Sequence, residues 1–151
     1  MGVTTMTGLK QARLRRFIIS WLLLLVLALP IYPGFVLAYT WFHVLRSPLP
    51  GGRHGPLDAY RHALASAVVA YTLDSRAIHL VNDAMERHGK QSNAMDIHNN
   101  LIGASIGAQA KRFSDIEPAV TNRVATGTVN ATAPDQITWL PERQWQEGSL
   151  R

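Results

Sequence analysis

The 151-residue chain contains no cysteine. This absence rules out disulfide bonds and metal sites with cysteine ligands. It agrees with a location in a bacterial envelope, although many cytosolic proteins also lack cysteine.

Charged residues are missing between Phe17 and Leu45. A bilayer core about 30 Å thick is spanned by about 20 apolar residues, so this run is long enough. Residues 17–42 are predicted to form a transmembrane anchor, with a cleaved signal peptide as the alternative. Residues 1–16 form a basic tail that predicts a cytoplasmic N-terminus. The predicted location is a single pass in the bacterial inner membrane, with the lipid bilayer as partner and the C-terminal domain periplasmic or extracellular.

An excess of positive charge is also missing from the rest of the chain, although the isoelectric point is about 10.1. From Arg46 to Arg151 there are 11 Lys and Arg against 10 Asp and Glu, a net charge of +1. A nucleic-acid-binding protein keeps a basic face on its folded part, so no nucleic acid is expected as partner. The sequence leaves the protein partners open.

The predicted fold is all-α, a compact bundle of about four short helices preceded by one N-terminal transmembrane helix. Residues 43–55 are rich in Pro and Gly and predict a linker, residues 56–127 a helical domain, and residues 128–151 an irregular tail that docks on it. Helix start and stop signals give the expected boundaries: Pro56 to about Leu73, Ser75 to Gly89, Asn93 to Lys111 and Ser114 to Gly127.

Two polar clusters interrupt the apolar helical sequence. In the first, Asp58 and His62 stand four residues apart and share a helix face, with Arg61 beside Asp58. The carboxylate can orient the imidazole of a general base or of a metal ligand. The structural alternative is an acid that favours the N-terminus of its helix and satisfies a buried histidine.

In the second cluster, Asp96, Asn99 and Asn100 share a face, whereas His98 lies about 200° away from Asp96 on a regular helix. Adjacent asparagines in a helix are costly, because asparagine competes for backbone hydrogen bonds. Bonds to the first cluster, to a substrate or to a metal ion would repay that cost. The two clusters are therefore expected to meet.

These residues give the candidate site. The predicted catalytic residues are Asp58, His62, Asp96 and Asn100; the predicted substrate-binding residues are Arg61, for an anionic group such as phosphate, and Asn99. A divalent ion such as Zn²⁺ would be held by His62, Asp96 and His98. The sequence contains no H-E-x-x-H, so the spacing matches no strong metal signature.

Gly103 and Gly107 form a G-x-x-x-G pattern, which lets another helix backbone come close. The pattern favours tight packing between the two helices that carry the clusters. The alternative is a second membrane-associated helix, but residues 101–110 are too few to span a bilayer.

The segments 58–63 (DAYRHA) and 95–103 (MDIHNNLIG) together resemble an uncharacterised bacterial helical family. Its members are exported proteins and C-terminal modules of large toxin-like proteins, and no reaction is established for it. The resemblance covers about residues 56–140 and implies that the two motifs form a site. The sequence departs from the family pattern at Leu64 and Ala65, where a Trp-Asn pair is common.

Two functional hypotheses follow. The protein is either an outward-facing envelope protein with a metal-assisted hydrolytic or toxin-like activity, or a non-enzymatic envelope protein whose polar clusters form a buried network between helices. The exposure of His62 and Asp96 discriminates between them, because a catalytic site must be open to its substrate.

Overall fold

The structure is a computed structural model that describes residues 13–22, 24, 30–79 and 91–146. Its contacts divide the chain into two units, Met1–Phe35 and Val36–Arg151, which are described separately. Four predictions fall partly outside the described residues. They concern the basic tail, the anchor predicted for residues 17–42, the predicted helix from Ser75 to Gly89, and the end of the C-terminal tail.

Within the first unit, residues 13–22 are helical. The large apolar side chains of this helix are exposed, and the rings of Phe17 and Trp21 pack edge to face at 5.9 Å. Helix α2 (Ile31–Arg46) begins in this unit and continues into the second. Pro30 and Pro33 lie immediately before the helix and in its first turn, where proline is favourable.

The predicted transmembrane helix is wrong: within the described ranges no helix is long and apolar enough to cross a membrane. Helix α2 has 16 residues, or about 24 Å of length, which falls short of a bilayer core. Its Val36, Thr40 and Val44 are buried on one stripe, so this part of the apolar run packs on protein. The location inferred from the anchor stays a prediction.

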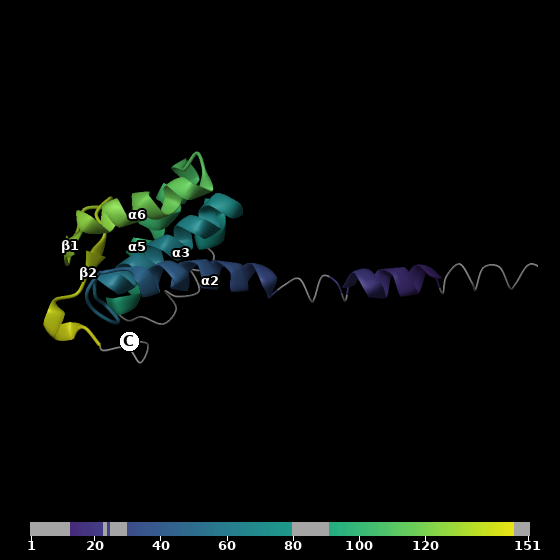
Figure 1. Cartoon of the computed structure of the whole chain (residues 1–151), viewed down its shortest axis with the longest axis horizontal. Coiled ribbons are helices and arrows are strands. Elements are labelled where there is room, and N and C mark those ends of the chain that lie inside the picture. Colours follow the sequence, from purple (N-terminus) through teal and green to yellow (C-terminus); the bar gives the residue numbers. More distant parts are fainter. Residues whose placement is uncertain (1–12, 23, 25–29, 80–90, 147–151) are drawn as a thin grey trace, which may run out of the picture. The chain divides into compact units, whose positions relative to one another are not determined.

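The second unit is built around helices α3 (Pro56–Thr72) and α5 (Gln91–Gln109), which lie side by side in Figure 1. Helix α3 begins at Pro56, as predicted, because proline suits the first helical position. Small side chains let the helices approach closely. A Cβ added to Gly103 would lie 2.1 Å from the carbonyl oxygen of Ala63, and one added to Gly107 would lie 2.1 Å from that of Ala67. The prediction of tight packing at the G-x-x-x-G pattern is confirmed.

Helix α6 (Ile116–Ala125) covers this pair and is preceded by the 3₁₀ turn η1 (Phe113–Asp115). The helix was expected to begin at Ser114, but a capping box formed by Arg112 and Asp115 begins two residues earlier. The carboxylate of Asp115 accepts hydrogen bonds from the backbone N–H and the guanidinium of Arg112. Ile116, Val120 and Val124 bury the inner stripe of the helix.

The all-α prediction is also wrong, because the C-terminal region contains a small parallel sheet. Strand β1 (Thr128–Val129) pairs with β2 (Thr138–Trp139), with Thr128 opposite Thr138. The strands consist of β-branched and aromatic residues, which favour extended backbone. A second 3₁₀ turn, η2 (Glu142–Gln144), follows. The segment predicted as an irregular tail thus contains two short strands and a 3₁₀ turn.

Candidate functional site

The first turns of α3 hold Asp58 in a fixed orientation. Its side chain is buried, and Oδ2 accepts a 2.7 Å hydrogen bond from the backbone N–H of His54. Oδ1 accepts a hydrogen bond from the guanidinium of Arg61, one turn further along the helix. Both carboxylate oxygens of Asp58 therefore accept a hydrogen bond from the protein itself.

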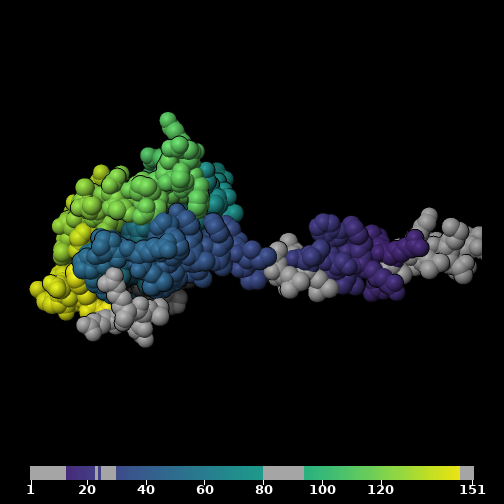
Figure 2. Space-filling model, in the orientation of Figure 1, coloured from purple at the N-terminus to yellow at the C-terminus, as the bar shows by residue number. Residues whose placement is uncertain are grey.

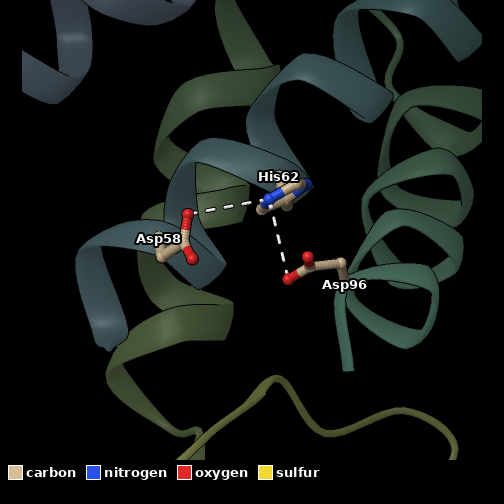
Figure 3. A group of neighbouring side chains, drawn as sticks. All are labelled: Asp58, His62 and Asp96. Carbon is tan, nitrogen blue, oxygen red and sulfur yellow. Dashed lines mark ion pairs between the residues drawn. The ribbon is translucent and has the colours of Figure 1, made fainter. Parts of the chain in front are cut away.

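The close packing of α3 on α5 brings the two predicted clusters together. The Nε2 atom of His62 lies 3.6 Å from Asp58 Oδ1 and 3.6 Å from Asp96 Oδ1, as drawn in Figure 3. Asp58, His62 and Asp96 each offer one ligand atom, and these atoms all lie within 4.8 Å of one another. The predicted meeting of the clusters is confirmed for these three residues.

The distances in this group identify what kind of contact it makes. A separation of 3.6 Å is too long for a hydrogen bond. Two ligand atoms bound at about 2.1 Å to one tetrahedral ion are about 3.4 Å apart. The two spacings at His62 are therefore close to the spacing of neighbouring ligands of one ion.

One carboxylate oxygen of Asp96 lacks a hydrogen bond in this group. Its Oδ1 atom is buried and has no hydrogen-bond partner among the described residues. Burial raises the pKa of Asp96, and the nearby Asp58 raises it further, whereas His62 acts in the opposite direction. The carboxylates of the buried Asp58 and the half-buried Asp96 repel each other, and a cation bound by both would offset this repulsion.

The raised pKa predicts how the metal-free protein responds to pH. The folded state holds the Asp96 proton more tightly than the unfolded chain, so the free energy of unfolding falls as pH rises from about 3.8 through the raised pKa. Asp96→Asn removes this loss. In the presence of a chelator, the variant should be more stable than the wild type at pH 7, and the difference should shrink towards pH 3.

Chemical denaturation of both proteins across this pH range measures the effect. If the wild type is more stable than Asp96→Asn at pH 7, then ionised Asp96 stabilises the folded state. That result would contradict the electrostatic account of the group.

His54 belongs to the same site but was not predicted as a site residue, because it lies in the segment predicted to be a linker. Its backbone has a φ of 70°, uncommon for a residue other than glycine, and its ring Nδ1 is buried, 3.9 Å from Asp58 Oδ2. The backbone N–H of Leu140 donates to its carbonyl oxygen at 2.9 Å, and Arg53 pairs with Gln146. The C-terminal segment thereby holds His54 beside Asp58. The only sequence signal is the spacing of four residues between His54, Asp58 and His62.

The remaining predicted site residues lie elsewhere on α5. His98, predicted as a metal ligand, has Nε2 2.9 Å from the carbonyl oxygen of Gln136. Asn99, predicted to bind substrate, is fully buried: its amide donates to the carbonyl oxygen of Thr138 and accepts from the Thr138 N–H. Asn100, predicted as catalytic, is buried and accepts a 3.0 Å bond from the Ser66 hydroxyl. These bonds account for the adjacent asparagines structurally.

The site is partly open. The side chain of His62 is 23% exposed, that of Asp96 13% and that of Arg61 32%. The Arg61 side chain is thus partly exposed beside the carboxylates, where it can meet an anionic group. The group is neither sealed in the core nor spread over the surface.

The fold and the site define a class of protein: a helical domain with a carboxylate–histidine group between two tightly packed helices. No protein-family model, no curated protein and no solved structure matches the chain. The resemblance to the bacterial helical family stays a prediction.

Proposed function

We propose that Asp58, His62 and Asp96 bind one divalent metal ion and that the domain is a metal-assisted hydrolase. The observation that carries this proposal is the grouping of three ligand atoms within 4.8 Å of one another, with the Oδ1 atom of Asp96 buried and lacking a hydrogen bond among the described residues. A dication would neutralise the two carboxylates and fill the missing contact.

The donor set suits Zn²⁺ or a similar ion, because imidazole nitrogen and carboxylate oxygen are both ordinary ligands for it. Catalytic zinc sites use three protein ligands and leave a position for water, whereas structural sites are closed by four. A bound ion would lower the pKa of that water and supply a nucleophile at neutral pH.

The surrounding residues have defined tasks in this proposal. His62 serves as a ligand, since its Nε2 faces both carboxylates. The His54 N–H fixes the Asp58 carboxylate, as partners of metal ligands commonly do. Arg61 faces solvent beside the group and would hold a phosphate or another anion of the substrate.

A non-enzymatic role for the polar clusters is the second candidate. It is favoured by Asn99 and Asn100, whose hydrogen bonds to Thr138 and Ser66 join secondary-structure elements without a ligand. It does not explain the buried Asp96 Oδ1, which such a network would pair. The hydrolase is therefore the better supported of the two.

The test is hydrolysis of bis(p-nitrophenyl) phosphate by the full-length protein with Zn²⁺ or Mn²⁺. We expect metal-dependent release of nitrophenolate that stops with a chelator and falls at least about 100-fold in His62→Gln. His79→Gln is the matched control, because His79 is an exposed helical histidine outside the group. A protein that binds metal but hydrolyses neither this probe nor a panel of carboxyl esters and amides would overturn the enzymatic proposal.

A further inference from the structure

The outward side of α2 is apolar and exposed. Its buried stripe faces the domain. Away from the stripe Phe42 is 49% and Leu45 67% exposed, and Leu37 at its flank is 58% exposed. Figure 2 shows α2, in blue, on the outside of the C-terminal unit. A helix that is apolar on every side is ordinarily covered on every side, so this face indicates an interaction surface.

Positive charge borders the apolar run in the sequence. Arg13, Arg15 and Arg16 precede it and are exposed, and Arg46 ends α2. The guanidinium of Arg46 lies 3.7 Å from the centre of the Phe42 ring, so an apolar side chain and a cation share one end of the face. Apolar residues flanked by Arg are typical of helices that lie at the surface of an anionic membrane.

We propose that the outward face of α2 docks on an anionic lipid surface, lying along it. Leu37, Phe42 and Leu45 would enter the boundary between headgroups and acyl chains, while Arg46 stays among the phosphates. Arg46 places a positive charge at one end of the face, which favours an anionic lipid surface as its occupant.

The proposed lipid surface also bears on the substrate. Trp41 of α2 lies beside the site, with its ring 5.8 Å from the guanidinium carbon of Arg61. Lipid docking would thus bring headgroup phosphates near Arg61, and a lipid phosphoester becomes the substrate class if the proposed hydrolase function holds. Docking itself needs no metal ion, so the two proposals fail separately.

The absence of cysteine makes this face directly testable, because a single introduced cysteine can carry a polarity-sensitive fluorophore. Leu45→Cys places the label on the face, and Leu73→Cys is the matched control, since Leu73 is a leucine 61% exposed at the end of α3. The full-length protein is titrated with vesicles of phosphatidylcholine alone or mixed with phosphatidylglycerol, with and without chelator.

We expect a blue shift of the Leu45 label with the phosphatidylglycerol vesicles, no shift of the Leu73 label, and no effect of the chelator. Arg46→Gln in the labelled protein should weaken binding about fivefold, the value of one basic residue near such a surface. Equal shifts of both labels, or none, would overturn the proposal. A shift of the Leu45 label that depends on protein concentration without lipid would replace it with self-association.

Discussion

Replacing Gly103 with alanine is expected to lower the free energy of unfolding of the C-terminal unit by about 3 kcal/mol or more. The added Cβ would lie 2.1 Å from the carbonyl oxygen of Ala63 and 2.7 Å from its Cα. These are backbone atoms of α3, so no side-chain rotation can relieve the clash. The two helices would have to separate, which also pulls Asp96 away from His62.

Gly34→Ala is the control, because a Cβ at Gly34 meets nothing within 4 Å. This change lies in α2 outside the helix pair, where alanine is favoured over glycine by about 0.5–1 kcal/mol. Urea denaturation followed by circular dichroism compares the variants with the wild type. If the free energy of unfolding of Gly103→Ala is within about 0.5 kcal/mol of the wild-type value, the two helices do not pack as closely as the structure shows.

Zinc titration should give one site per chain, and His62→Ala or Asp96→Ala should lower its affinity at least about 100-fold. Each variant removes one of the converging ligand atoms, and changes to residues that merely orient ligands already cost 10–100-fold, roughly. In the wild type, zinc at about 100 times its dissociation constant should stabilise the fold by about 2.7 kcal/mol.

His98→Gln supplies a sharp control for this titration. His98 lies on the same helix as Asp96 but has its ring nitrogen beside the carbonyl oxygen of Gln136, so its loss should leave zinc affinity unchanged. Isothermal calorimetry and thermal unfolding report affinity and stabilisation on the same samples. Affinity that falls with His98→Gln and survives Asp96→Ala would move the site elsewhere.

The central part of the site could be predicted from local sequence. The spacing of Asp58 and His62 sets them on one helix face, and the Gly103 pattern predicts a close partner helix. Asp96 lies about two turns before Gly103 on that helix. When α3 packs against α5, the side chains of Asp58, His62 and Asp96 are therefore brought close together.

Other parts depend on contacts between distant segments, which local periodicity does not reveal. His54 lies at the site because the C-terminal segment forms hydrogen bonds with it and with its neighbour Arg53. The side-chain amide of Asn99 is hydrogen-bonded to the backbone of β2. Both contacts join residues far apart in the sequence. The same limit explains the two-strand sheet that the all-α prediction missed.

The transmembrane prediction failed for a different reason. It rested on the length of an uncharged run, but composition alone does not say where helices begin or what they pack against. Pro30 and Pro33 stand at the start of α2, and Val36, Thr40 and Val44 pack on the domain. Only the outward face of the helix is left to meet another surface.

The most direct test of the metal site is anomalous diffraction at the zinc edge from crystals of the full-length protein grown with zinc. We expect one peak about 2.0–2.2 Å from His62 Nε2 and from an oxygen of both Asp58 and Asp96. The Asp96 Oδ1 atom, buried and without a hydrogen bond, should be among its ligands. A zinc-saturated crystal with this position empty and the peak at other residues would contradict the account.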